Sequence, residues 1–207
     1  MITARIAGVD ATKILMRSEL SAVLADLHRK APRSANTRMN LAIFRLAVCC
    51  GLRVSEIGAL RLCDLNLSRP RPHVRVPRGA AKGGKPRTVP LWWDAGTLAD
   101  LAAWKAERQK EGAADEDVLI TSRRHSGPLS RHTLRKRFLT ACKCLGSQRI
   151  STLTVHHGRH TFISHALAGG RTLAEVRDAA GHANVSITSG YLHVAINEDE
   201  EAGHLFG

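Results

Sequence analysis

The sequence is short of aromatic side chains and of long apolar runs. Only 4% of its 207 residues are aromatic, and tyrosine occurs once, at Tyr191. No apolar run approaches the ~20 residues that a membrane-crossing helix needs, and the first ten residues lack the hydrophobic stretch of a secretion signal. We therefore expect neither a membrane protein nor an exported one. The length and the 43% content of hydrophobic residues predict one compact domain.

Cysteine does not occur in the arrangement that a disulfide framework requires. The chain has five cysteines, an odd number, and Cys49 and Cys50 are adjacent. A domain of this length does not need disulfides to fold, so we expect reduced thiols in a cytoplasmic protein. Cys49, Cys50, Cys142 and Cys144 are interpreted as small apolar fillers rather than metal ligands.

Acidic residues are missing from two long stretches. Residues 65–93 contain seven Lys or Arg and residues 118–174 contain ten, with no Asp or Glu in either stretch. The whole chain has 31 Lys or Arg against 18 Asp or Glu, a net charge of +13, and four of the acids stand together at Glu198 to Glu201. A solvated surface usually mixes both signs. This distribution therefore favours a polyanionic partner, nucleic acid before an anionic membrane.

The hydrophobic pattern predicts a mainly α domain with a small antiparallel β-sheet, the α+β class. Helices are expected at 18–29, 36–50, from Ser55, at 97–110 and at 130–144, and another runs from the Thr172 and Glu175 capping box to Gly181. Residues 73–77 and 87–93, joined by a glycine-containing turn, predict a basic β-hairpin, and residues 117–120 predict a short strand.

Polar residues that could carry chemistry gather around two arginines and the single tyrosine. Arg53 stands in GLRVSEIGAL, just after the glycine that ends a buried helix, and Glu56 follows one helical turn later. A simple ion pair between the two residues is an alternative explanation. Further along come His156, Arg159 and His160 in VHHGRHTF, His182 in AGHANVS and Tyr191 in SGYLHV.

These segments resemble the tyrosine recombinases, a family that includes phage integrases and the recombinases that resolve chromosome dimers. The resemblance runs from the helix at Ser18 to about Val194 and includes GLRVSEIGALRLCDL, AKGGKPRTVPL, HHGRHTFISHAL and AGHANVSITSGYLHV. It implies a tyrosine recombinase catalytic-domain fold over residues 16–193, with 1–15 as an N-terminal arm or linker and 194–207 as an acidic C-terminal tail. It also implies site-specific DNA recombination.

The resemblance assigns a role to each member of the polar set. Arg53 and Arg159 would grip the scissile phosphate, His156 and His182 would complete the cluster, Tyr191 would attack phosphorus, and Lys82 would be the hairpin lysine. Attack on a phosphodiester builds charge on its non-bridging oxygens, which two guanidinium groups can stabilise without a metal or other cofactor. The phenol, with a pKa of ~10, needs a nearby base such as His156. Lys82, or its rival Lys85, would protonate the leaving 5′ oxygen, and the product would be a 3′-phosphotyrosyl bond.

Other residues are candidates for supporting roles. Glu56 and His160 are placed beside the phosphate site, although His160 is as well explained as a core or capping histidine. Contacts to DNA are expected from Arg75, Arg78, Lys85, Arg87, Arg131 and Arg135. Three alternatives are less favoured. A P-loop at 79–86 would need Ser or Thr where Pro86 stands, and a zinc site would use the histidines of 156–165. Trp92 and Trp93 could stack on bases, but packing at a strand end explains them better.

The sequence also departs from the family pattern. Gly158 and Ala180 stand where leucine is common, and we expect looser packing there. About 17 residues precede the first helix, so the chain is either a catalytic domain of a longer protein or a short standalone member. The family pattern implies a homotetramer on two double-stranded DNA sites, with accessory DNA-bending proteins as further candidate partners. Two alternatives remain: a type IB topoisomerase, and a DNA-binding relative that has lost catalysis.

Overall fold

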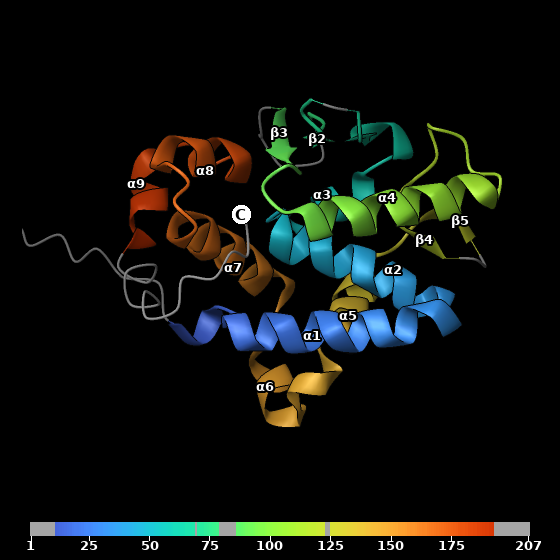
Figure 1. Cartoon of the computed structure of the whole chain (residues 1–207), viewed down its shortest axis with the longest axis horizontal. Helices are drawn as coiled ribbons and strands as arrows, with labels where there is room; N and C mark the ends of the chain where they lie inside the picture. Colours follow the sequence, from blue (N-terminus) through green and yellow to red (C-terminus); the bar gives the residue numbers. More distant parts are fainter. Residues whose placement is uncertain (1–10, 69, 79–85, 123–124, 193–207) are drawn as a thin grey trace, which may run out of the picture.

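The computed structural model describes residues 11–68, 70–78, 86–122 and 125–192, which form a mainly helical domain with two small antiparallel sheets (Figure 1). The predicted fold class is confirmed. The α-helices are α1 Arg17–Lys30, α2 Ala35–Phe44, α3 Val54–Ala59, α4 Ala95–Lys110, α5 Arg131–Ala141, α6 Ser147–Thr152, α7 Val155–Ala168, α8 Leu173–Ala180 and α9 Val185–Ser189. Within the described part of the chain, no helix combines the length and the apolar character that crossing a membrane requires. Most of the predicted arm, the hairpin turn with Lys82 and Lys85, and the acidic tail lie outside the described residues.

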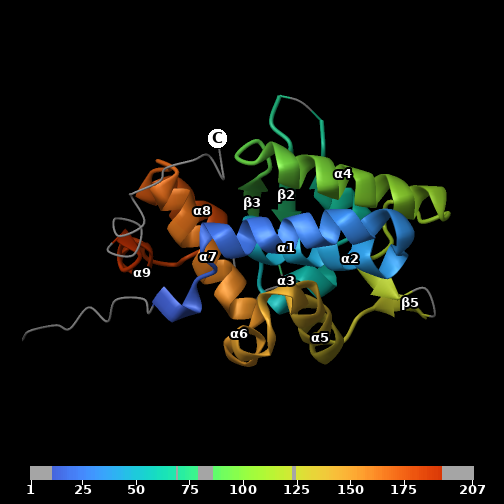
Figure 2. The ribbon, with the colours of Figure 1, turned by 60° about the horizontal axis from the view of Figure 1, so that its bottom comes forward.

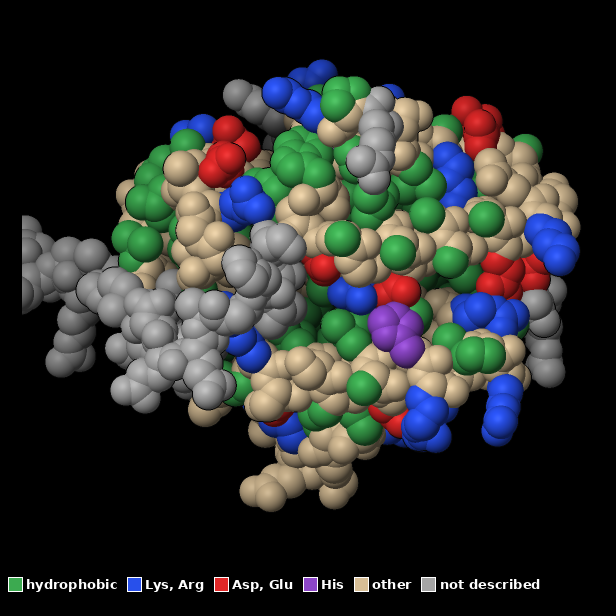
Figure 3. Space-filling model, viewed as in Figure 1, with side chains coloured by type: hydrophobic (Ala, Val, Ile, Leu, Met, Phe, Trp, Pro, Cys, Tyr) green, Lys and Arg blue, Asp and Glu red, His purple; other side chains and the backbone are tan. Residues whose placement is uncertain are grey.

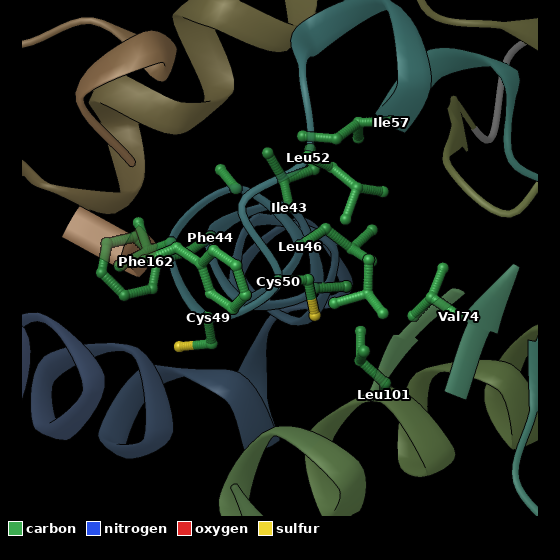
Figure 4. Packing of buried hydrophobic residues seen from close by; sticks show 14 of the residues in the cluster. Ile43, Phe44, Leu46, Cys49, Cys50, Leu52, Ile57, Val74, Leu101 and Phe162 are labelled. Atoms are coloured by element: carbon green, nitrogen blue, oxygen red, sulfur yellow. The ribbon is translucent and has the colours of Figure 1, made fainter. Parts of the chain in front are cut away.

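The core is built around α2, which is contacted by α1, α4 and α5. α2 continues directly into a π-helical segment, Arg45–Cys49, so the predicted helix at 36–50 is confirmed in extent. Figure 4 looks along this helix and shows Phe44, Leu46 and Cys50 ringed by side chains of other elements, among them Leu101 of α4 and Phe162 of α7. Figure 2 shows α1, α4 and α5 on different sides of α2, and α7 packs against the π-helical segment. Every residue from Met39 to Cys50 is buried, and all of them except Asn40 and Arg45 are apolar, as expected of a helix enclosed by other elements.

The central helix ends at Gly51, as predicted, and the backbone there requires glycine. Gly51 has a φ of 63°, in the left-handed region, and a Cβ at this position would lie 2.5 Å from Cδ1 of Phe162. The chain therefore turns tightly under α7 before it reaches Arg53. The same contact that closes the helix brings Arg53 close to α7.

A three-stranded antiparallel sheet confirms the predicted hairpin. β1 Leu65–Asn66, β2 His73–Val76 and β3 Arg87–Pro90 lie in the order β1, β2, β3, with Val74 opposite Val89. Val74, Val76 and Val89 are buried, while Arg75 between them is exposed, which is the alternation of a sheet with one covered face. A second pair, β4 Thr121–Ser122 and β5 His125–Pro128, forms a short hairpin next to α4.

A buried arginine ties the π-helical segment to α1 and α4. Arg45 is almost fully buried, and its guanidinium donates to Asp100 at 2.7 Å and to Asp94 at 3.2 Å. His28 of α1 contacts the same Asp100 carboxylate at 2.9 Å. Figure 3 shows acidic, basic and histidine side chains meeting in the furrow between α4 and α1. A charge buried this deeply is tolerated because two carboxylates pair with it.

The segment that precedes α1 is held to α6 and α7 by side chains. The Leu15 N–H donates to the Thr161 hydroxyl at 2.9 Å, and the Leu15 carbonyl lies 2.8 Å from Nε2 of His165. Arg149 donates to the carbonyls of Thr12 and Ile14 at 2.7 and 2.6 Å. Residues 12–15 thus pack as part of the domain, although the sequence assigns them to an arm.

Several sequence predictions need correction. The strand predicted at 117–120 is a single bridge between Val118 and Arg61, and the regular strand begins at Thr121. The helix predicted to reach Cys144 ends at Ala141, and a 3-10 turn, Lys143–Leu145, follows it. Cys49, Cys50 and Cys142 are buried fillers as predicted, but Cys144 is exposed because it lies in that turn. Trp93 packs in the core, whereas Trp92 is exposed.

Gly158 tightens the packing of α7, which is the opposite of the loosening that we predict from the sequence. A Cβ at this position would lie 2.9 Å from the carbonyl oxygen of Ala47 and 3.2 Å from Cγ2 of Val48. α7 can therefore approach the π-helical segment closely only because Gly158 has no side chain. The second departure, Ala180, is fully buried at the end of α8.

Substitution of Gly158 by alanine should destabilise the fold. The added methyl group forces α7 away from Ala47, and overpacking of this kind costs about 1–3 kcal/mol, which exceeds the gain of up to ~1 kcal/mol in helix propensity. Urea unfolding followed by circular dichroism measures the difference. Gly127→Ala is the matched control, because no atom lies within 4 Å of a Cβ built there. Equal stability of the two variants would contradict the packing argument.

Candidate active site

The candidate site lies where α7, α8 and α9 meet α3 and β3, on one side of the molecule (Figure 1). Arg53 is the N-cap residue of α3, with an extended backbone at φ −70° and ψ 153°. The fully buried Glu56 accepts hydrogen bonds from the Arg53 N–H at 2.8 Å and from the Arg53 guanidinium at 2.9 Å. The ion pair considered from the sequence is therefore present. The Arg53 side chain remains 38% exposed and can still reach an anion.

Arg87 closes the other side of Glu56. Its two terminal nitrogens donate to the two Glu56 carboxylate oxygens, each at 2.8 Å, and its Nε donates to the Ala179 carbonyl at 2.9 Å. The Arg87 side chain is only 9% exposed, which leaves little of its surface for DNA, and the predicted contact of Arg87 with DNA stays a prediction. The exposure is low because β3 packs against α8, which leaves this guanidinium facing a buried carboxylate instead of solvent.

The two arginines control the ionisation of Glu56. Burial alone would raise the pKa of this carboxyl group, but hydrogen bonds and charges from Arg87 and Arg53 outweigh burial and hold the pKa below its usual value. Glu56 is therefore an anion near neutral pH, and it links α3 to β3.

Arg159 is the most deeply buried cation of the site. Its guanidinium donates to the carbonyl of Gly51 at 3.0 Å and to the carbonyl of Ala180. Burial and the nearby charges of Arg53 and Arg87 lower the pKa of Arg159, yet a guanidinium keeps its proton in a protein. Two backbone carbonyls thus fix a positive charge beside Arg53, with no carboxylate bonded to it among the described residues.

His182 follows the left-handed turn that ends α8. Gly181 has a φ of 67°, and a Cβ there would lie 2.7 Å from Cδ of Arg87, so only glycine lets β3 and α8 approach this closely. The predicted capping box and glycine terminus of this helix are confirmed. Nδ1 of His182 is hydrogen-bonded to the Thr188 hydroxyl at 2.9 Å. Burial and the charges of Arg159 and Arg53 lower the pKa of His182 to about 4, which leaves it neutral at pH 7.

Tyr191 follows α9, and its hydroxyl meets His160. The phenol oxygen lies 2.6 Å from Nδ1 of His160, the two rings are stacked at 5.6 Å, and Tyr191 is 6% exposed. Burial raises the pKa of Tyr191 above its usual value, although Arg159 opposes this shift. Sequence reasoning assigns the base at Tyr191 to His156. The structure instead places His160 at the hydroxyl, with the His156 ring edge-on to His160 at 4.7 Å.

Of the other predicted residues, those that the structure describes lie apart from this cluster. Arg75 is paired with Asp64 at 3.0 Å but remains largely exposed, and Arg78, Arg131 and Arg135 are exposed. Lys82 and Lys85 lie outside the described residues. The histidines of 156–165 belong to no group of ligands that could hold a metal ion in the described ranges. Sequence reasoning missed Thr188 and the carbonyls of Gly51 and Ala180, and no motif in the sequence signals them.

A sequence comparison decides the family. The sequence profile of the phage integrase family matches residues 13–198, most of the chain. The chain belongs to the phage integrase family. Tyrosine recombinase XerC of Chromobacterium violaceum is 36% identical over 151 residues, which are 72% of this chain and 46% of that protein. Tyrosine recombinase XerD of Halalkalibacterium halodurans is 31% identical over 184 residues, 88% of this chain and 57% of that protein. This integrase-family chain thus spans about half the length of these two relatives.

Solved structures share the fold of this phage integrase family member. XerA recombinase superposes with a TM-score of 0.70 at 24% identity, covering 89% of this chain and 62% of that chain. XerH site-specific recombinase, bound to its difH substrate, gives a TM-score of 0.69 at 24% identity, covering 87% and 50%. The predicted tyrosine recombinase catalytic-domain fold is therefore confirmed.

Replacement of Glu56 by glutamine in this integrase-family site should cost about 3 kcal/mol at pH 7, because Arg87 loses its buried counter-charge. The loss should depend on pH. The folded-state pKa of Glu56 is below the ordinary value of 4.5 for this side chain. The stabilisation by its carboxylate is therefore fully present above pH 4.5 and disappears as pH falls through the folded-state pKa. Urea unfolding of the wild type and of Glu56→Gln from pH 7 to pH 3.5 should show that the difference between their free energies of unfolding becomes smaller.

Glu116→Gln supplies the control for this prediction. Glu116 pairs with Arg61 at 3.1 Å on the surface, where both side chains are exposed, and its loss should change stability by less than about 0.5 kcal/mol. A gap for Glu56→Gln that stays constant down to pH 3.5 would show that its carboxylate contributes packing and not charge.

Proposed function

We propose that the protein cleaves and rejoins double-stranded DNA at a specific site through a covalent 3′-phosphotyrosyl intermediate, as a metal-independent site-specific recombinase. One observation carries the proposal. The hydroxyl of Tyr191, the only tyrosine of the chain, is hydrogen-bonded to the neutral His160, and the positive charge of the buried Arg159 favours the ionised form of the phenol. A phenol held among cations is suited to attack an anionic phosphodiester. The family membership of the chain supports the same reaction.

In this proposal Arg53 and Arg159 bind the non-bridging oxygens of the scissile phosphate. The bonds from Arg159 to two backbone carbonyls and from Arg53 to Glu56 hold both guanidinium groups in place before DNA arrives, so no reorganisation is needed as charge develops. His182, neutral and anchored by Thr188, contributes a further donor to the phosphate, and His156 stands at the edge of the cluster. By resemblance, Lys82 protonates the leaving 5′ oxygen, with Lys85 as the rival.

The proposed partner is double-stranded DNA. Two structural neighbours support this proposal: XerH recombinase is bound to its difH substrate, and Tn1549 transposon integrase is in complex with transposon right end DNA. The acid-free stretch 118–174 places exposed Arg131 and Arg135 one turn apart on α5, and Arg75 and Arg78 are exposed at the end of β2. We propose that residues 16–193 form the catalytic domain. We further propose that the whole protein acts as a homotetramer on paired sites in the bacterial cytoplasm, with accessory DNA-bending proteins as additional partners.

Tyr191→Phe should abolish covalent capture of DNA and leave DNA binding intact, because the change removes only the attacking oxygen. The DNA is a duplex selected from a random pool by binding to the Tyr191→Phe protein, with a nick placed just downstream of the cleavage position. The wild-type protein should form an adduct that survives detergent and EDTA. Loss of the adduct in EDTA, or its persistence in Tyr191→Phe, would overturn the mechanism. Recombined junctions from supercoiled plasmids carrying two sites, rather than topoisomers, separate recombination from topoisomerase activity.

Binding of duplex DNA should depend steeply on salt, and Arg131 and Arg135 should account for part of that dependence. Each phosphate contact contributes a slope of about −0.9 in log K against log salt, so Arg131→Gln with Arg135→Gln should flatten the slope by about 1.8. Fluorescence anisotropy of labelled duplex DNA measures this slope between about 50 and 200 mM salt, a range over which such slopes change affinity strongly. The control is Arg29→Gln with Lys30→Gln on α1, where both cations pair with Asp26. Equal slopes in the two double variants would place the DNA elsewhere.

A further inference from the structure

One contact in the site is unexplained by phosphate binding: the short hydrogen bond between His160 and Tyr191. Nδ1 of His160 lies 2.6 Å from the phenol oxygen, and within the described ranges no other ring nitrogen is hydrogen-bonded to that oxygen. We propose that His160 is the catalytic base that takes the phenol proton when Tyr191 attacks phosphorus. This inference rests on the proposed function and adds to it the residue that activates the nucleophile.

The neighbouring histidines are less suited to this role. Nδ1 of His182 is engaged with Thr188, and the ring of His182 is stacked with the phenol ring at 6.4 Å instead of meeting its oxygen. His156 lies edge-on to His160, one helical turn earlier on α7. A base must lie within about 2.6–3.2 Å of the proton-bearing atom, and His160 satisfies this condition.

The surroundings of His160 keep its imidazole unprotonated and able to accept. The groups that face it are His156, His157 and Arg159 from α7, Lys13 from the 3-10 turn before α1, and Tyr191 itself. Burial, His156, His157, Lys13 and Arg159 together lower the pKa of His160 to about 4. A weak base in the resting protein becomes stronger as negative charge develops on the bound phosphate beside it, so proton transfer accompanies attack rather than preceding it.

The step balances without a co-reactant. The phenol oxygen of Tyr191 forms a bond to phosphorus and its proton passes to Nδ1 of His160. The bond from phosphorus to the 5′ oxygen breaks, that oxygen keeps the electron pair, and the proposed acid Lys82 protonates it. In religation the 5′ hydroxyl attacks phosphorus and returns its proton to the neutral Lys82. The bond from phosphorus to the phenol oxygen breaks, and His160 returns its proton to that oxygen.

His160→Gln separates proton acceptance from positioning. A glutamine side-chain oxygen can still accept the hydrogen bond of the phenol, but it cannot carry the proton away. The measured quantity is the rate of adduct formation on the nicked duplex described above. At pH 7 the variant should be slower by about 100-fold, the usual scale of general base catalysis. Between pH 6 and 9 the wild-type rate should not require ionised phenol, whereas the variant rate should rise with pH as the phenol ionises unaided.

The single tyrosine permits a second readout. Protein produced with 3,5-difluorotyrosine carries the more acidic phenol at position 191 alone, because the chain has one tyrosine. A phenol that ionises near neutral pH needs no base, so the difference between the wild type and His160→Gln should shrink to less than about tenfold. His157→Gln is the matched control: this histidine accepts from the Thr154 N–H at the start of α7, and any loss of rate there should not be restored by fluorination.

Each outcome bears on the proposal. A pH-dependent loss in His160→Gln that difluorotyrosine restores supports His160 as the base. A wild-type rate in His160→Gln, or a loss that neither pH nor fluorination relieves, overturns the assignment while the recombinase function stands. Thermal unfolding of each variant identifies a folding defect, which would produce the second pattern. Absence of any adduct with the wild-type protein overturns the proposed function and this inference together.

Discussion

The fully buried carboxylate of Glu56 between two guanidinium groups governs the geometry of the site. A buried anion is tolerated only when it is paired, so Arg53 and Arg87 must both reach it. Arg87 in turn donates to the carbonyl of Ala179 at the end of α8, and the next carbonyl, that of Ala180, receives Arg159. One charge therefore holds α3, β3 and α8 together and indirectly positions Arg159.

Three glycines allow these elements to come close enough for such contacts. Gly51 lies against Phe162, Gly158 against the Ala47 carbonyl and Gly181 against the side chain of Arg87. In each case a methyl group would lie within 3 Å of a neighbouring atom, so a larger residue would push apart the elements that carry the polar groups. The positions of the polar side chains in the candidate site thus follow from close backbone contacts made by residues that have no functional groups of their own.

Sequence patterns were sufficient for the helices with a strong apolar stripe, the hairpin and the set of polar residues around Tyr191, because each rests on local spacing. They failed where the outcome depends on contacts between distant segments. Nothing near Arg87 in the sequence reveals that its guanidinium meets Glu56, 31 positions away, so its charge was assigned to DNA. Likewise, His156 and His160 share a helix face, and only the placement of Tyr191 after α9 selects His160 as the hydrogen-bond partner.

The π-helical segment has a consequence for changes in chain length. In Arg45–Cys49 the backbone hydrogen bonds join residues five positions apart instead of four, as in the bond from the Cys50 N–H to the Arg45 carbonyl at 3.0 Å. The segment therefore holds one residue more than an α-helix of the same rise. Deletion of one residue there would restore a regular α-helix of the same rise, so the elements before and after the segment would keep their relative orientation. A deletion in the regular helix α2 would instead rotate Arg53 and Glu56 by about 100° relative to α2, so the π-helical segment should tolerate the loss of one residue better than α2 does.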